Sequence, residues 1–474
     1  MNKNNFIRFF NCPIPVTGCN LRCDYCYLVQ QGNEKLLDFK ETNEGFKYSV
    51  EHMLKALTPE RLGGICAFHI CGEGETFLWA DIVKFAYGLY EMGHFVSFTS
   101  NCTVTKVINE FISFPEKFRK KMFFKCSFHY REFERLGLLE RFADNVNRLA
   151  AAGISYTVEL VTNDYVLEKL DEIKAFSIEK FGALPHVLTQ RSELVKGKYP
   201  RMESVMDSEY YDKTWRSFKS DLFTYHQAEF DKKHNEFCYA GVYSLQFHLK
   251  DGNVYPCPGN NKKIVNLFYD IDQKPIFAPV GHNCPFDNCW FAYVTNILGG
   301  CNRDLISDTY FADFRDRVRE DSGKHWLSET MRTAYGCRCS EFHEPMQEEQ
   351  KLFIDLLMRK YYTGKEPFDV ERQKLVKIIK SGMETKGFRN VIIYGMASLG
   401  EWIKGILREA EIEIICGIDQ RCKDILTDID MISPNDNIPE ADAIIVTAYG
   451  EFSQIYSFLS KKTNTEIISV LQLI

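Results

Sequence analysis

Three cysteines near the N-terminus have the types and spacing of a redox-active metal site. They stand as Cys19, Cys23 and Cys26, with Tyr25 just before the last thiol and an apolar stretch, Phe6 to Phe10, ahead of them. Three thiolates on one short loop can ligate three irons of a cubane cluster, whose fourth iron then stays open to another ligand. A zinc site or buried free thiols are the alternatives, although no second cysteine pair lies nearby to complete four zinc ligands. The spacing therefore predicts an iron–sulfur cluster with one open iron.

A glycine-rich turn follows the apolar stretch Ile65 to Cys71. It reads Gly72-Glu73-Gly74-Glu75-Thr76. Glycine lets the main chain approach a ligand closely, and a carboxylate beside it can accept hydrogen bonds from an ammonium group. The alternative is an ordinary loop between a strand and a helix.

Small polar residues stand where two further apolar stretches end. Asn101 ends the stretch Phe95 to Asn101, Ser127 lies near the end of Met122 to Phe128, and His129 comes directly after it. Such residues are often helix N-caps, but the carboxyl ends of parallel strands are also where ligands bind. Glu159 and Arg191 should face the same end of the sheet if their stretches are strands.

These residues need a scaffold, and the first part of the chain alternates between two patterns. Amphipathic helical stretches, such as Trp79 to Met92, Glu140 to Ala152 and Val166 to Phe176, fall between apolar runs. Repeated strand–helix units of this length predict an α/β fold with a parallel sheet, either open or curled into a barrel. The six candidate strands are Phe6 to Phe10, Ile65 to Cys71, Phe95 to Asn101, Met122 to Phe128, Ser155 to Val161 and His186 to Gln190.

The cysteine loop with Tyr25 and Tyr27, followed by the glycine turn, resembles the radical S-adenosylmethionine (radical SAM) enzymes. Gly74-Glu75 is similar to that family's GGE motif, although Glu73 stands where a glycine is usual. The resemblance implies a partial (β/α)6 barrel and a [4Fe-4S] cluster on Cys19, Cys23 and Cys26. It also implies S-adenosylmethionine as cofactor and an external one-electron reductant of the flavodoxin or ferredoxin type. The residues expected to bind the cofactor are Tyr25, Gly74, Glu75, Asn101 and Ser127.

A second group of cysteines lies further along the chain. Cys238 precedes an alternating run, the turn Lys250-Asp251-Gly252 and a second run ending at Cys257, which is a hairpin signal that brings the two thiols together. This spacing resembles the opening of the SPASM and twitch extensions, which hold auxiliary iron–sulfur clusters, although the later cysteine block of SPASM is absent. We expect at least one auxiliary cluster, with zinc as the alternative. The candidate ligands are Cys238, Cys257, Cys284, Cys289, Cys301, Cys337 and Cys339.

The last part of the chain carries a different motif. An apolar run ending at Tyr394 leads into Gly395-Met396-Ala397-Ser398-Leu399-Gly400, and Asp419 follows the next apolar run. Strand, G-x-A-x-x-G turn, helix and a later acid form a Rossmann-type fingerprint. Because alanine takes the position of the motif's middle glycine, we favour a recognition or docking domain over a second redox site. We therefore expect four parts: 1–204 the barrel, 205–345 the cysteine-rich α+β extension, 346–386 a helical bridge, and 387–474 a Rossmann-like domain.

Composition limits the partners. The chain has 474 residues, of which 45% are hydrophobic, and a net charge of −7 without a long basic block, so neither nucleic acid nor a membrane is an expected partner. No export signal is recognisable, and 17 cysteines without one predict metal or redox roles in the cytoplasm rather than disulfides.

The predicted function is that of a radical SAM enzyme. It would cleave S-adenosylmethionine to a 5′-deoxyadenosyl radical and abstract hydrogen from a small substrate, with a sugar- or nucleotide-linked molecule as the candidate. One alternative is a maturase-like enzyme that modifies a peptide or protein. The other is a non-catalytic metal-binding or redox-sensing protein.

Overall fold

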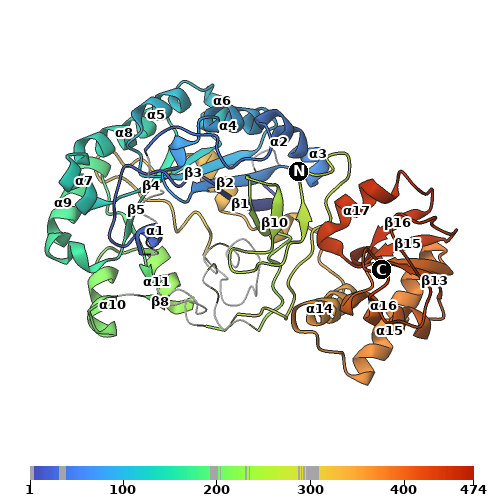
Figure 1. Cartoon of the computed structure of the whole chain (residues 1–474). Coiled ribbons are helices and arrows are strands. Elements are labelled where there is room, and N and C mark those ends of the chain that lie inside the picture. Colours follow the sequence, from blue (N-terminus) through green and yellow to red (C-terminus); the bar gives the residue numbers. More distant parts are fainter. Residues whose placement is uncertain are drawn as a thin grey trace.

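The computed structural model of the chain contains two parallel sheets of different size (Figure 1). It describes residues 5–30, 32, 39–192, 201–202, 204–229, 232–233, 235–286, 289, 291, 294 and 309–474. None of the helices among these residues is both long and apolar enough to cross a membrane.

Six parallel strands form the larger part of the first sheet, in the order β1-β2-β3-β4-β5-β6. Sequential order with a crossover after each strand is the pattern predicted from the alternating apolar and amphipathic stretches, and the α/β class is confirmed. The strands are β1 Arg8–Ile14, β2 Cys66–Gly72, β3 Phe95–Ser100, β4 Met122–Ser127, β5 Ser155–Val161 and β6 His186–Leu188.

The crossover helices line the outer arc of this sheet, while the strands lie on its inner side (Figure 1). In α8, Phe142, Val146 and Leu149 are buried at i, i+4 and i+7, so one stripe of the helix faces the sheet. The expected helix Val166 to Phe176 is instead a 3₁₀ turn, η3 Asp164–Lys169, followed by α9. The other elements between β1 and β6 are α1 Tyr27–Gln30, α2 Val50–Ala56, α3 Pro59–Leu62, η2 Thr76–Leu78, α4 Ile82–Glu91, α5 Thr105–Ile112, α6 Glu116–Arg119, α7 Tyr130–Leu136, α8 Leu139–Ala151 and α9 Leu170–Phe181.

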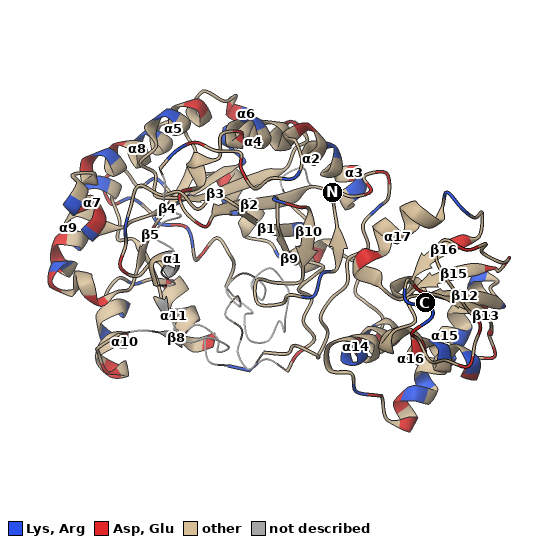
Figure 2. Ribbon diagram, in the orientation of Figure 1, with Lys and Arg blue, Asp and Glu red and all other residues tan. Residues whose placement is uncertain are grey.

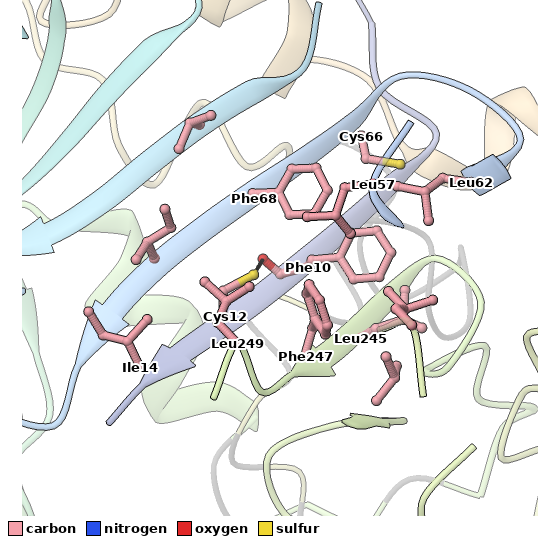
Figure 3. Close-up of a cluster of buried hydrophobic side chains, with 14 of the residues drawn as sticks. Phe10, Cys12, Ile14, Leu57, Leu62, Cys66, Phe68, Leu245, Phe247 and Leu249 are labelled. Carbon is pink, nitrogen blue, oxygen red and sulfur yellow. Dashed lines mark hydrogen bonds between the residues drawn. The ribbon is translucent and has the colours of Figure 1, made fainter. Parts of the chain in front are cut away.

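The outer face of the sheet is packed with alternate residues of β1 and its neighbours (Figure 3). Phe10, Cys12 and Ile14 are buried on this face, and the Phe10 ring stacks on Phe68 of β2 with centroids 5.1 Å apart. Because strand side chains alternate, the intervening residues of β1 point into the barrel. Figure 2 shows both signs of charge interspersed along the outer helices, whereas the strands carry few charges.

The predicted hairpin is present and has a position that the sequence did not indicate. β9 Ser244–Phe247 and β10 Asn253–Tyr255 pair antiparallel, and β11 Val265–Asn266 pairs with β10. Gly252 has φ +84° in the turn between β9 and β10. β9 also pairs in parallel with β1, so the hairpin extends the barrel sheet to nine strands.

The starts of the barrel strands are closed by a later segment of the chain. Phe311, Phe314 and Tyr335 pack with residues at the beginnings of the strands, including Phe9 and Phe123. This apolar plug, residues 309–342, contains α13 Glu329–Tyr335 and η6 Cys339–Phe342. Among the described residues, the plug therefore covers the starts of the barrel strands.

The C-terminal part is a separate parallel sheet with helices on both sides. Its strand order is β14-β13-β12-β15-β16, the doubly wound pattern predicted from the Rossmann-type motif. The elements are α14 Glu348–Thr363, α15 Asp369–Lys386, β12 Asn390–Tyr394, α16 Ser398–Glu409, β13 Glu413–Ile418, β14 Met431–Ile432, β15 Ala443–Val446, η7 Tyr449–Glu451, α17 Phe452–Leu459, β16 Glu466–Ser469 and η8 Val470–Gln472. Between β6 and β9 the chain forms β7 Arg191–Ser192, β8 Arg201–Met202, α10 Ser208–Arg216 and α11 Asp221–Glu229.

The C-terminal domain rests on the hairpin region. Asn260 donates a hydrogen bond to the Tyr362 hydroxyl (3.1 Å), and Lys263 pairs with Glu451 (2.5 Å). The rings of Tyr361 and Tyr449, both in the C-terminal part, lie 4.9 Å apart beside this contact. These contacts attach the domain to the residues that follow Cys257. The domain boundaries stay predictions.

Candidate active site

The three thiols predicted to hold a cluster border one cavity. Cys19, Cys23 and Cys26 lie in the loop after β1, and the cavity has a volume of about 500 Å³. It opens at the carboxyl ends of the strands, because its lining includes Gly72, Ser100, Ser127, Val161 and Leu188 at or just beyond the ends of β2 to β6. Cofactor and substrate sites of this size are typical of enzymes.

The buried surroundings of these thiols favour a metal-bound thiolate over a free thiolate. Burial raises the pKa of the Cys19 thiol to about 12, and it raises the pKa of Cys23 as well. An iron centre supplies the positive charge that a buried thiolate needs. Within the described part of the chain, no three His, Cys, Asp or Glu side chains meet as they would around a single metal ion. Three thiols around one cavity suit a cluster, whose ligands bind separate irons.

The glycine turn after β2 is fastened to the cysteine loop. The main-chain N–H of Gly74 donates to the Val16 carbonyl (2.7 Å), and that of Glu75 donates to the Gly18 carbonyl (2.7 Å). A Cβ on Gly74 would overlap the main-chain oxygens of Thr17 and Gly18. Glycine is therefore required here by the approach of two main chains.

The Glu75 carboxylate is buried and already accepts three hydrogen bonds. Oε1 accepts from Ser100 Oγ (2.6 Å) and from the Phe77 N–H (3.0 Å), and Oε2 accepts from the Asn101 N–H (2.8 Å). Burial raises the pKa of Glu75, while these donors act in the opposite direction. A carboxylate oxygen can accept two hydrogen bonds, so Oε2 keeps one site for a ligand.

Asn101 connects β3 to the cysteine loop. Its Nδ2 donates to Asn20 Oδ1 (2.7 Å), and Asn20 in turn donates to Thr103 Oγ1 (3.0 Å). Sequence reasoning missed Asn20 and Thr103, although Asn20 stands directly after Cys19 inside the motif. The Asn101 side chain therefore orients the cysteine loop as well as lining the cavity.

Tyr25 and His129 form one wall of the cavity. The Tyr25 hydroxyl and His129 Nδ1 are 2.7 Å apart, and the two rings stack with centroids at 5.9 Å. Burial lowers the pKa of His129 to about 4, so its ring is neutral at pH 7. Ser127, at the end of β4, lies on the same cavity.

Glu159 does not line this cavity. It is buried and forms ion pairs with Arg315 of the plug and with Lys125 of β4, whose Nζ is 3.5 Å from Glu159 Oε2. Sequence reasoning missed both cations; the alternation of β4 places Lys125 on the same face as Ser127 and could have indicated it. The side chain of Arg191 lies outside the described residues.

Three of the downstream cysteines come together. Cys238, Cys257 and Cys284 lie close enough for their charges to interact. Burial raises the pKa of the Cys257 thiol to about 12 and that of the Cys284 thiol to about 11. The main chain of Cys238 also exchanges hydrogen bonds with Gly281 (3.1 Å each). The predicted approach of Cys257 to Cys238 through the hairpin is therefore found. Pro258, the next residue, lines the main cavity.

The remaining candidate ligands are placed differently. Cys339 is buried beside Cys66 and Arg8 at the starts of β2 and β1, and Cys337 stands two residues before it, beside Glu341. Cys289 is among the residues that the structure describes, whereas Cys301 lies outside them.

The turn of the C-terminal domain is occupied by its own residues. Gly395 has φ +90°, and a Cβ on Gly400 would overlap the Gly395 carbonyl, so both glycines are needed for the close approach of strand and helix. Asp419, the acid of the predicted Rossmann-type fingerprint, accepts from the Met396 N–H (3.0 Å) and the Arg421 N–H (2.9 Å). The Met396 side chain is buried in the same region.

Comparisons with known proteins find similarity among solved structures. Streptococcus suis SuiB bound to S-adenosylmethionine matches with 16% identity and a TM-score of 0.37, over 57% of this chain and 64% of that chain. SuiB bound to the precursor peptide SuiA matches with 16% identity and a TM-score of 0.38, over 67% and 77%. Native anSMEcpe with bound AdoMet matches with 16% identity and a TM-score of 0.35, over 55% and 78%. In the first of these matches, this chain covers less than two thirds of the length of SuiB.

No protein-family profile matches the chain, and no curated protein matches it by sequence. At these identities and TM-scores the structural matches record similarity alone. Any functional assignment therefore depends on the site of this chain.

Proposed function

We propose that the chain is a radical SAM enzyme that reductively cleaves S-adenosylmethionine and abstracts a hydrogen atom from its substrate. The observation that carries this proposal is the shared cavity: three thiols in C-x3-C-x2-C spacing and a glycine turn bonded to their loop border the same 500 Å³ space. A zinc site of three cysteines would not need the second loop, whereas a cluster with a bound organic cofactor would.

When bound, the cluster supplies the electron that cleaves S-adenosylmethionine to a 5′-deoxyadenosyl radical. Cys19, Cys23 and Cys26 would hold it. The remaining acceptor site on Glu75 Oε2 would take the ammonium group of the cofactor, and Ser127 would contact its ribose or methionyl part. Asn101 fixes the loop that carries the thiols, and Tyr25 with His129 provides a wall against which the cofactor can pack.

Water must be kept from a carbon radical, and the plug contributes to this. Phe311, Phe314 and Tyr335 are buried against the strand starts below the cavity, where they would hinder the entry of solvent from that side. An external one-electron reductant of the flavodoxin or ferredoxin type would serve the cluster.

An auxiliary cluster on Cys238, Cys257 and Cys284 is part of the proposal. The three thiols are neighbours, and the residue after Cys257 reaches the main cavity, which would let such a cluster exchange an electron with the substrate site. Zinc at the same thiols is the alternative, and metal analysis distinguishes the two.

The substrate we favour is small and linked to a sugar or nucleotide. A Rossmann-like domain, to which we assign a recognition role, rests against the hairpin that carries Cys257. A peptide substrate is the alternative, since SuiB and anSMEcpe are both described with bound peptides.

The test is anaerobic incubation of reconstituted protein with S-adenosylmethionine and dithionite, followed by chromatography for 5′-deoxyadenosine. We expect product from the wild type and none from Cys23→Ala. Cys416→Ala is the matched control, because Cys416 is a buried thiol of the C-terminal domain. If the wild type holds its cluster and makes no 5′-deoxyadenosine, the protein is not this enzyme, and the non-catalytic metal-binding or redox-sensing role becomes the better explanation.

A further inference from the structure

Two amide side chains on neighbouring strands meet at the main cavity. Asn11 of β1 and Gln246 of β9 stand opposite each other in the register of the two parallel strands. Asn11 Nδ2 donates a hydrogen bond to Gln246 Oε1 (2.6 Å), and both residues line the 500 Å³ cavity. Gln246 is only 9% exposed, so its amide is largely shielded from bulk solvent. We call these two side chains the amide pair.

The amide pair keeps hydrogen-bonding capacity after this bond. A side-chain amide has one acceptor oxygen and two N–H donors. Within the described part of the chain, the bond between Asn11 and Gln246 is the hydrogen bond that these side chains make, which leaves Asn11 Oδ1 as an acceptor and Gln246 Nε2 as a donor. If both amides were turned by 180°, the pair would still offer one oxygen and one nitrogen. The cavity therefore contains a donor beside an acceptor that a ligand can satisfy.

The histidine beside the amide pair is occupied by other side chains. His69 lies next to the pair in the register of β1 and β2, and its two ring nitrogens bond to the hydroxyl groups of Ser97 (2.8 Å) and Thr99 (3.0 Å). Burial lowers the pKa of His69, so its ring is neutral at pH 7. Lys125, which also lines the cavity, pairs with Glu159 (3.5 Å). The amide pair itself therefore offers uncharged hydrogen bonds.

The amide pair lies below the proposed cofactor contacts. Asn11 stands three residues before Ile14, the last residue of β1, and so about 10 Å deeper along the strand. Glu75 and Asn101, by contrast, come after the ends of β2 and β3. A ligand bound by the amide pair would therefore lie deeper in the barrel than the cofactor, which is where a substrate would meet it.

We propose that the amide pair binds two neighbouring hydroxyl groups of a sugar and so selects the substrate. This inference rests on the proposed function for the meaning of the cavity. A hydroxyl group both donates and accepts, and its hydrogen rotates to suit its partner, so a pair of hydroxyl groups can satisfy an oxygen and an N–H that come from two different side chains. Leaving these buried amide groups without partners would cost free energy, which favours a ligand that satisfies them over an apolar one. Asn11 and Gln246 thus determine specificity.

The test uses reconstituted, full-length protein saturated with S-adenosylmethionine, without reductant, so that the cofactor stays intact. Equilibrium dialysis measures the binding of labelled glucose, labelled uridine diphosphate glucose and labelled acetamide. We expect at least one glucose probe to bind the wild type more tightly than acetamide, and to bind Asn11→Leu and Gln246→Met at least tenfold more weakly. The tighter of the two glucose probes shows whether the sugar is free or linked to a nucleotide. Asn253→Leu is the matched control, because Asn253 accepts from Asn266 Nδ2 (2.9 Å) in an amide contact outside the cavity lining.

A double variant addresses the effect on folding. Asn11→Leu or Gln246→Met alone breaks the bond within the pair and leaves the other amide without it, whereas the two changes together remove both polar groups and should be tolerated better. We expect the double variant to bind the glucose probe as weakly as the single variants do, and to bind S-adenosylmethionine as the wild type does.

Four results would overturn the proposal. They are no binding of either glucose probe to the wild type, tighter binding of acetamide than of both glucose probes, equal binding of the glucose probe by the double variant and the wild type, or a loss of S-adenosylmethionine affinity in the double variant. The last would assign the amide pair to the cofactor. Formation of 5′-deoxyadenosine by the wild type tests the proposed function separately, and without substrate it should continue in the double variant.

Discussion

Gly74 lies directly against the main chain of Gly18, so that the turn after β2 and the loop of the three cysteines form one unit. Two segments separated by about fifty residues thereby build one side of the cavity. The relationship is steric as well as polar, since neither loop could shift without breaking hydrogen bonds of the other. Cluster binding and cofactor binding should therefore depend on the same contact.

Gly74→Ala tests this contact. The added Cβ would overlap two carbonyl oxygens, so the loops must separate, at a cost of about 1–3 kcal/mol. We expect lower iron content after reconstitution and weaker S-adenosylmethionine binding, measured by iron analysis and calorimetry. Gly405→Ala in α16 is the control, because its Cβ would meet only the flexible Arg372 side chain. Normal iron and normal cofactor affinity in Gly74→Ala would show that the loops bind independently.

The Glu159 ion pairs predict unequal effects of three substitutions. Glu159→Gln leaves two buried cations without their carboxylate and should lower the free energy of unfolding by about 3–5 kcal/mol. Lys125→Met leaves the Glu159–Arg315 pair intact and should cost less than half as much. Arg315→Met should fall between them. Urea unfolding of the three variants measures the order, and a Lys125→Met variant less stable than Glu159→Gln would contradict it.

His94 predicts a loss of stability in mild acid. It is fully buried, accepts from the Cys66 N–H (3.0 Å) and donates through Nε2 to the Leu57 carbonyl (2.8 Å). Burial lowers its pKa to about 4 from the usual 6.5. The unfolded chain therefore binds the proton more readily, and stability falls as the pH drops below about 6.5, by about 1.4 kcal/mol per pH unit.

The measurement is the free energy of unfolding between about pH 7.5 and pH 5.5, a range in which the folded His94 stays neutral. His94→Gln should show a flatter dependence on pH, although it is less stable at pH 7 because its hydrogen bonds change. An unchanged slope in His94→Gln would assign the acid sensitivity to other groups.

Metal content separates the two cysteine sites. The triple variant with Ala at Cys19, Cys23 and Cys26 should lose about four irons and keep the rest. Cys257→Ala should show the opposite, with loss of the auxiliary metal and retention of the first cluster. Iron, zinc and labile sulfide are measured per chain after anaerobic reconstitution. Loss of all iron in the triple variant would mean that the downstream cysteines hold zinc or no metal.

Cys339→Ala provides the comparison for Cys257→Ala. Cys339 lies beside Cys66 and Arg8, away from the neighbours that Cys257 has, so its replacement should leave both iron and sulfide unchanged. A fall in iron equal to that of Cys257→Ala would restore Cys339 to the ligand set predicted from the sequence.

Much of the fold follows from local patterns in the sequence. The six barrel strands were predicted within a few residues because each is an apolar run bounded by a turn or helix signal, as in Ser155–Val161. The hairpin before Cys257 followed from its Asp-Gly turn, and the C-terminal sheet followed from the spacing of Gly395, Gly400 and Asp419. The spacing of Cys19, Cys23 and Cys26 alone determined the kind of chemistry expected.

Tertiary structure decided which distant segments meet. The pairing of β9 with β1, the plug that carries Arg315 into the barrel, and the separation of Cys339 from Cys257 have no local signal. Such contacts depend on the packing of apolar surfaces across hundreds of residues, and the spacing of residues along the chain does not encode them. The sequence by itself therefore determined the reactive residues and their strands, while only the folded chain determined that Lys125 and Arg315 share the Glu159 carboxylate.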